Sequence, residues 1–175
     1  MGFSTAMAGG IMLFAMLSMM MTMPSFLSSS QELDQIYKQK SSTLSHIQKT
    51  SLDIDSISAT PVSSIIDVYL KNSGSTKLYN FEKFLILVDY DANISGTSSR
   101  TIHSFNYVDS CIPTSGNWCV SQIDDDIADP GLLNPDETLH IQIALSNPVI
   151  DGGNLILVVS SDKGITTTKS QQVIS

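Results

Sequence analysis

The stretch Leu78–Val108, LYNFEKFLILVDYDANISGTSSRTIHSFNYV, decides the fold of this 175-residue chain. Apolar side chains alternate with polar ones in two of its segments, Leu78–Asp89 and Arg100–Val108. Because successive side chains of a β-strand point to opposite faces of a sheet, this alternation predicts two half-buried strands. The polar run that begins at Asp91 interrupts the pattern, which predicts a turn between the two strands.

The same alternation recurs through the rest of the chain after Asp53, and Gly, Asn, Pro or Asp separates the segments. The predicted strands are Leu52–Ser58, Ser64–Lys71, Leu78–Asp89, Arg100–Val108, Trp118–Ile123, Glu137–Ala144, Leu155–Ser160 and Thr166–Val173. Short strands at a spacing of roughly 10–15 residues, with no long helix between them, are typical of an antiparallel β-sandwich. We therefore expect a single mainly-β domain over residues 52–175.

The N-terminal part of the chain differs from this domain because it carries no charge. The run Gly2–Leu27 contains no Asp, Glu, Lys or Arg, and all eight methionines lie within Met1–Met23. As a helix this run would be roughly 39 Å long, more than the roughly 30 Å hydrocarbon core of a bilayer. No basic residue precedes it, as one would in a cleaved secretory signal. We therefore predict an uncleaved transmembrane anchor helix over residues 1–27 and a helical stalk over residues 28–51.

Three small residues recur at a spacing of four within this anchor, namely Gly2, Ala6 and Gly10. Residues four apart share a helix face, and small side chains there allow two helices to approach closely in a membrane. The pattern predicts packing into an oligomer or filament. The general abundance of Gly and Ala in membrane helices explains the same residues, and both interpretations stay open.

The balance of charge restricts the possible partners of the chain. There are 17 acidic residues and nine basic ones, which gives a formal net charge of −8. Phosphate binding needs clustered Lys and Arg, so we expect no nucleic-acid partner. Lys38 and Lys40 after the anchor favour a cytoplasmic C-terminal side, whereas a long domain is translocated largely regardless of charge.

The two cysteines favour a location of the domain outside the cytoplasm. Cys111 and Cys119 flank a short loop that contains Pro and Gly, and they predict a disulfide in an oxidising compartment. Two free thiols in a reducing compartment are the alternative. Asn93 begins an Asn-Ile-Ser triplet in a predicted loop, which makes it a candidate glycosylation site on an exterior domain.

Motifs for catalysis and cofactor binding are missing from the sequence. It contains no GxSxG, HExxH, P-loop or GxGxxG motif. We therefore expect that the protein is not an enzyme and that it binds no cofactor. The densest acidic cluster contains Asp124, Asp126 and Asp129, which are weak candidates for a calcium site. Because EF-hand spacing is absent, a solvated acidic loop is the simpler interpretation.

Four segments together carry a resemblance to a known family. They are the start Met-Gly-Phe-Ser that leads into the apolar helix, the turn KNSGSTK at Lys71–Lys77, the run LNPDETL at Leu133–Leu139, and the turn SDKGI at Ser161–Ile165. In these features the chain resembles the archaeal flagellar (archaellum) accessory proteins FlaF and FlaG, which are relatives of archaellin. The resemblance implies an immunoglobulin-like antiparallel β-sandwich that follows a membrane anchor and lies outside the cytoplasmic membrane. The basic residue before the leader cleavage point of archaellins and pilins is absent here, which favours an anchor over a processed filament subunit.

The resemblance implies a non-enzymatic, stator-like component of the archaellum, whose exterior domain binds the surface layer during motility. The expected partners are the surface-layer protein, other archaellum components, further copies of the chain in an oligomer or filament, and the membrane. One alternative is a filament-forming archaellin or type IV pilin-like subunit. Another is a membrane-tethered, calcium-dependent adhesin.

Overall fold

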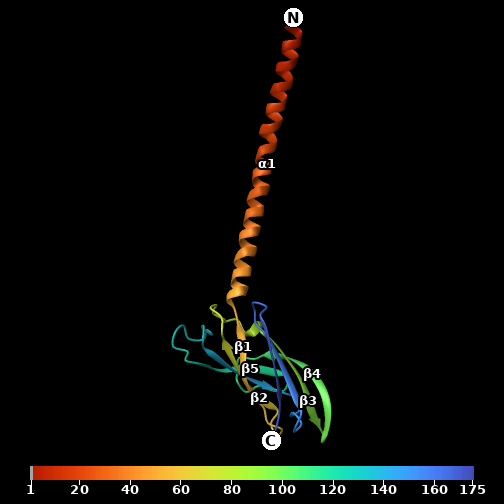
Figure 1. Ribbon diagram of the computed structural model, residues 1–175, viewed down its shortest axis with the longest axis vertical. Coiled ribbons are helices and arrows are strands. Elements are labelled where there is room, and N and C mark those ends of the chain that lie inside the picture. Colours follow the sequence, from red (N-terminus) through yellow and green to blue (C-terminus); the bar gives the residue numbers. More distant parts are fainter. Residues whose placement is uncertain (1) are drawn as a thin grey trace. The chain divides into compact units, whose positions relative to one another are not determined.

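The computed structural model describes residues 2–175, with the side chains of residues 2–6, 22–34 and 46–48 outside this description. The chain divides into two compact units, Met1–Ser45 and His46–Ser175 (Figure 1).

The first unit belongs to one long helix, α1 (Gly2–Lys49). The helix continues through both the predicted anchor and the predicted stalk, without a break near residue 27. The side chains from Met7 to Met21 are all exposed. In the described parts of the chain, no helical stretch has the length and apolar character that a membrane crossing requires. The transmembrane anchor therefore stays a prediction.

The predicted helix-packing face is only partly described. Gly10 has open space where a Cβ atom would lie. The surroundings of Gly2 and Ala6 lie outside the description. Packing through this face therefore stays a prediction.

The second unit contains eight strands. They are β1 (Leu52–Ser58), β2 (Ile65–Asn72), β3 (Leu85–Ile94), β4 (Thr97–Tyr107), β5 (Asn117–Asp124), β6 (Thr138–Ala144), β7 (Asn154–Ser160) and β8 (Thr166–Gln172). Their order is β1-β2-β6-β5-β4-β3-β7-β8. All neighbours pair antiparallel except β4 and β5, which run parallel and pair only at Asn106 with Asn117 and Tyr107 with Trp118. This confirms the mainly-β prediction.

The region around β3 differs most from the sequence prediction. The segment before it forms an isolated bridge between Leu78 and Leu133, and then a 3-10 turn, η1 (Phe81–Lys83). β3 continues through the polar run at Asp91 as far as Ile94, because the reversal is made by Ser95 and Gly96, whose φ angles are +53° and +84°. Two consecutive residues with positive φ form the hairpin turn that matches the twist of paired strands.

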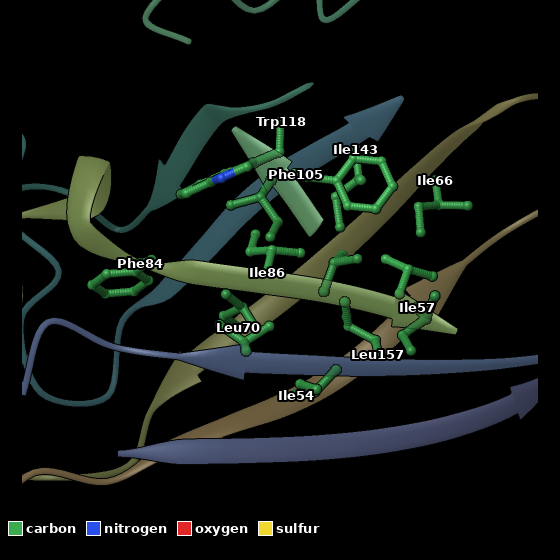
Figure 2. Close-up of a cluster of buried hydrophobic side chains, with 14 of the residues drawn as sticks. Ile54, Ile57, Ile66, Leu70, Phe84, Ile86, Phe105, Trp118, Ile143 and Leu157 are labelled. Carbon is green, nitrogen blue, oxygen red and sulfur yellow. The ribbon is translucent and has the colours of Figure 1, made fainter. Parts of the chain in front are cut away.

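The core lies between the two halves of the sheet (Figure 2). Ile66 and Leu70 of β2 and Trp118 of β5 come from one half, and Ile86 of β3 and Leu157 of β7 come from the other; all five are fully buried. Alternate residues of β2, β3, β6 and β7 are buried. This period of two explains why the strands were predictable from the sequence.

Candidate interaction surfaces

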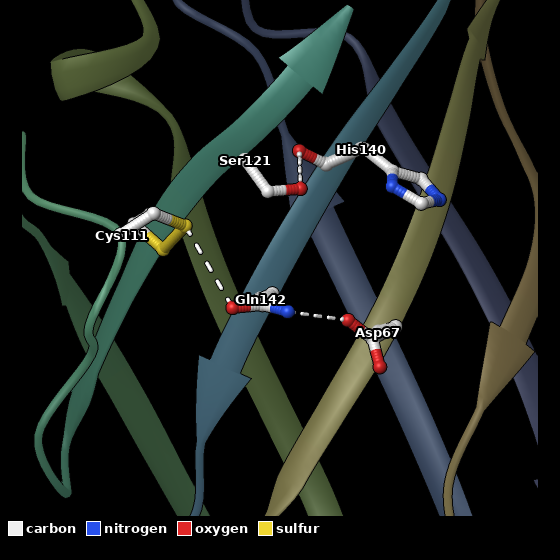
Figure 3. The surroundings of a disulfide bond; sticks show 6 residues. Asp67, Cys111, Ser121, His140 and Gln142 are labelled. Carbon is white, nitrogen blue, oxygen red and sulfur yellow. Dashed lines mark hydrogen bonds between the residues drawn. A yellow bond between two sulfur atoms is a disulfide. The ribbon is translucent and has the colours of Figure 1, made fainter.

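The loop between β4 and β5 is closed by a disulfide between Cys111 and Cys119, as predicted (Figure 3). Sγ of Cys111 lies 3.8 Å from Oε1 of Gln142 on β6. Nε2 of Gln142 in turn donates a 2.9 Å hydrogen bond to Oδ1 of Asp67 on β2. The disulfide therefore attaches the loop to β5. Through its contacts with Cys111 and Asp67, Gln142 connects this loop to β6 and β2.

Trp118 packs behind this loop. Its side chain is fully buried, and its ring meets the ring of Tyr107 edge-on at a centroid distance of 4.9 Å. Trp118 is thus a core residue and not an exposed contact anchor. It fixes the position of Tyr107, whose other side faces a surface cavity.

The cavity was not apparent from the sequence. It has a volume of about 220 Å³ and is lined by Tyr79, Asn80, Phe81, Glu82, Tyr107 and Asp109. Burial raises the pKa of Tyr107, and the negative charges of Asp109 and Glu82 raise it further. The pocket therefore combines aromatic surface with two carboxylates. Tyr79 to Glu82 lie in the segment before β3, whereas Tyr107 is the last residue of β4 and Asp109 follows it. Only the folded sheet brings these two segments together, so no sequence motif could have identified them.

Lys163 lies beside this cavity. Its Nζ is 5.7 Å from the centre of the Tyr79 ring and 3.0 Å from Oδ2 of Asp162. A hydrogen bond to Asp162 raises the pKa of Lys163. The same carboxylate accepts a 3.1 Å hydrogen bond from Nδ2 of Asn80. The β7–β8 turn thereby supports the wall of the cavity.

The predicted acidic residues do not converge on one point. Asp124 accepts a hydrogen bond from Gln122, Asp126 accepts one from the backbone N–H of Gly131, and Asp129 pairs with Lys77. Within the described residues there is no group of three His, Cys, Asp or Glu side chains that could hold a metal ion. The calcium site stays a prediction.

Asn93 lies at the end of β3, next to the hairpin turn, and not in the middle of a loop. Its Oδ1 accepts a 2.9 Å hydrogen bond from the N–H of Gly96, and its own N–H donates to the carbonyl of Pro148. Ser95, the third residue of the triplet, is in the turn itself. Glycosylation at Asn93 stays a prediction.

An ion-pair cluster lies on the outer face of β3 and β4. Nε of Arg100 is 2.5 Å from Oδ1 of Asp89, and its NH1 group is 3.2 Å from Oδ1 of Asp91. The pKa of Asp91 is lowered mainly by the hydrogen bond that it accepts from the N–H of Asn154, and also by Arg100. The pKa of Arg100 is raised, mainly by its hydrogen bond to Asp89.

Comparison with solved structures identifies similar folds among archaeal flagellar proteins. The archaeal flagellum of Methanospirillum hungatei strain JF1 matches with a TM-score of 0.69 and 13% identity, over 98% of this chain and 94% of that one. Flagellin FlaB1 of Methanocaldococcus jannaschii matches with a TM-score of 0.52 and 11% identity, over 71% and 90%. These two likenesses show the fold alone. The archaellum periplasmic stator protein FlaG from Sulfolobus acidocaldarius has a TM-score of 0.49 and 21% identity, over 70% and 99%.

No curated protein matches the chain. Residues 48–169 match the family described as conserved flagellar protein F, immunoglobulin-like domain. This family comprises structural components of the archaellum, which confirms the expectation that the chain is not an enzyme. The match covers the whole sandwich except the last part of β8 and the C-terminus. The chain therefore belongs to the flagellar protein F immunoglobulin-like family and is an archaellum accessory protein of the FlaF/FlaG type.

Proposed function

We propose that this protein is a stationary, membrane-anchored component of the archaellum, and that its sandwich lies outside the cytoplasmic membrane and binds the surface-layer protein. Torque on the rotating filament would then act against a fixed lattice. The single observation that carries the proposal is the family match over residues 48–169.

The disulfide supports an exterior location for the sandwich. Disulfides persist in oxidising compartments, and the two cysteines of this chain are bonded to each other. The outward position of the domain also agrees with the rule that long domains are translocated largely regardless of charge.

The apolar N-terminal run supports attachment to the membrane. Between Met7 and Met21, large apolar side chains such as Ile11 and Phe14 are more than two-thirds exposed, at 71% and 75%. Contiguous exposed apolar surface marks membrane or protein contacts. Because the uncharged sequence continues to Leu27, we assign this part of α1 to the lipid core.

Within this function, we assign the surface-layer contact to the cavity lined by Tyr79, Glu82, Tyr107 and Asp109. Tyr79 is 54% exposed, and tyrosine is enriched among the residues that contribute most to binding at interfaces. The two carboxylates would pair with basic groups of the partner. Trp118 and the disulfide hold the cavity wall in place before the partner arrives, which lowers the entropy cost of binding.

Binding to purified surface-layer protein tests this function. The full chain is immobilised in detergent, and its affinity is compared with that of the double variant Glu82→Lys/Asp109→Lys. Asp55→Lys/Asp151→Lys changes two exposed positions outside the cavity and is the matched control for charge. We expect binding by the wild type and the control, and at least a tenfold loss in the double variant. Absence of binding by the wild-type chain would contradict the stator proposal, and equal binding by all three would contradict only the assignment of the cavity.

The second candidate function is a filament subunit. It is favoured by the likeness to the Methanospirillum hungatei flagellum, which extends over 98% of this chain and therefore includes α1. In that case the exposed apolar side chains of α1 would contact neighbouring helices instead of lipid.

A further inference from the structure

The cavity between the segment before β3 and the end of β4 has room for one side chain. Its volume of about 220 Å³ is below the range of roughly 300–1,000 Å³ that is typical of pockets for drug-sized molecules. Three of the residues that line it are aromatic, namely Tyr79, Phe81 and Tyr107. A ligand that fits is therefore small and has a surface that can lie against rings.

The polar groups of the cavity are mainly acceptors. Glu82 and Asp109 contribute carboxylates, which accept hydrogen bonds and donate none when they are ionised. Nδ2 of Asn80 donates to Oδ2 of Asp162, and the amide oxygen of Asn80 remains as an acceptor. The hydroxyl of Tyr107 is hydrogen-bonded to Asp109. The complementary ligand is a group that carries donors only.

The negative charge of the cavity is not balanced within the sandwich. In the part of the chain that the structure describes, neither Glu82 nor Asp109 belongs to an ion pair. Lys163 lies beside the cavity but is paired with Asp162, and Lys83 is not among the lining residues. The two carboxylates are exposed and therefore attract a cation from outside the chain.

Contacts behind the cavity hold its rings in place. The ring of Phe81 meets that of Phe84 edge-on at a centroid distance of 5.6 Å, and Tyr107 meets Trp118 in the same way at 4.9 Å. Phe81, Phe84 and Trp118 are all buried. A cation can therefore bind against these rings with little loss of side-chain freedom in the protein.

The donors and the rings together favour a guanidinium group over other ligands. A guanidinium is planar, stacks on aromatic rings, and carries five N–H donors and no acceptor. A lysine ammonium is a more strongly hydrated point charge, and Lys163 already places one 5.7 Å from the centre of the Tyr79 ring. The hydroxyl of a sugar has acceptor lone pairs as well as a donor, and these lone pairs would face carboxylates.

We propose that the cavity takes one arginine side chain of the partner protein. Its guanidinium would lie against the rings of Tyr79 and Tyr107, and its N–H groups would donate to Glu82 and Asp109. The inference rests on the proposed function for the source of this arginine, which is the surface-layer protein. The guanidinium site itself can be tested without that partner.

Binding of N-acetyl-L-arginine amide to the full chain in detergent tests the site. The ring signals of isotope-labelled tyrosines report binding by NMR, and we expect those of Tyr79 and Tyr107 to shift saturably. N-acetyl-L-lysine amide should bind at least about fivefold more weakly. N-acetyl-L-citrulline amide has nearly the shape of the arginine compound without its charge, and it should give no saturable shift.

A charge variant shows whether the compound binds in the cavity. Glu82→Gln/Asp109→Asn removes both carboxylates with little change of shape and should weaken binding of the arginine amide at least about tenfold. Asp55→Asn/Asp151→Asn removes two charges at exposed positions outside the cavity and is the matched control. Equal binding of the arginine, lysine and citrulline amides, or binding that the cavity variant does not weaken, would overturn the proposal.

Chemical modification of the surface-layer protein separates the guanidinium site from the proposed function. Phenylglyoxal blocks arginines and should weaken binding of that protein to the wild-type chain at least about tenfold, whereas acetylation of its lysines should not. Binding that survives phenylglyoxal, or that acetylation abolishes equally, would overturn the arginine assignment and leave the stator function standing. If the chain binds the arginine amide selectively but does not bind unmodified surface-layer protein, the guanidinium site stands and the proposed function is contradicted.

Discussion

Opening the disulfide should destabilise the sandwich by an amount that follows from the size of its loop. Cys111 and Cys119 are separated by eight positions. The loss of loop-closure entropy in the unfolded chain then corresponds to about 2.5 kcal/mol at 25 °C. For the unit His46–Ser175, the average unfolding entropy per residue converts this into a fall in Tm of about 9 °C.

Thermal unfolding followed by circular dichroism measures this change in the full chain, oxidised and reduced. Reduction keeps both sulfur atoms in place, so it isolates the effect of the covalent link. The variant Cys111→Ala/Cys119→Ala should lose somewhat more, because Cys119 is fully buried and its truncation leaves a small cavity. Reductant should have no effect on this variant, which makes it the control. A change in Tm below about 3 °C on reduction would refute the entropic reasoning.

Three further predictions concern stability. Leu157→Ala removes a fully buried side chain of β7 and should cost about 2–5 kcal/mol in urea unfolding; a cost below about 1 kcal/mol would mean that the core is packed differently. Gly74→Ala would place a Cβ atom 2.3 Å from the backbone N of Ser51 and 2.6 Å from the carbonyl O of Lys49, so it should lower the free energy of unfolding by about 1–3 kcal/mol. Gly131→Ser is the comparison: it has open space around the new Cβ atom but a positive φ, and it should lower the free energy of unfolding by less. The fold lowers the pKa of Asp91 from its usual 3.8. The ionised carboxylate therefore stabilises the folded state fully above pH 3.8, and this stabilisation is lost as the pH falls through the pKa of Asp91 in the folded state. Asp91→Asn should therefore flatten the loss of stability below about pH 4, and an unchanged pH profile would argue against the hydrogen bond from Asn154.

The sequence predicted β2, β3, β6 and β7 because every second side chain of these strands is buried. It also predicted the Cys111–Cys119 bond, since the two residues flank a short loop. It misplaced the turn after β3, because the polar side chains of Asp91 and Asn93 are compatible with a strand whose outer face is exposed. Hydrogen bonds and an ion pair to neighbouring strands keep that segment extended.

The cavity could not be predicted from the sequence. The cavity joins Tyr79 and Glu82, from the segment before β3, with Tyr107 and Asp109, from the end of β4 and the loop after it, and these segments are adjacent only in the folded sheet. The predicted half-burial of the strand Arg100–Val108 was wrong, because β4 meets β5 at only two positions and Phe105 is its one buried residue. The cavity and the exposure of β4 both depend on how the strands pair in the folded sheet, which the pattern of residues along one strand does not show.

The cellular location of the native protein tests the central claim most directly. Membranes and sheared filaments are separated from motile cells, and the protein is quantified in each fraction by mass spectrometry together with its N-terminal sequence. The account predicts that the protein is found in the membrane fraction with the run Gly2–Leu27 retained, and that it is absent from sheared filaments. Enrichment in the sheared filaments, with a trimmed N-terminus, would contradict a stationary anchor and establish a filament subunit.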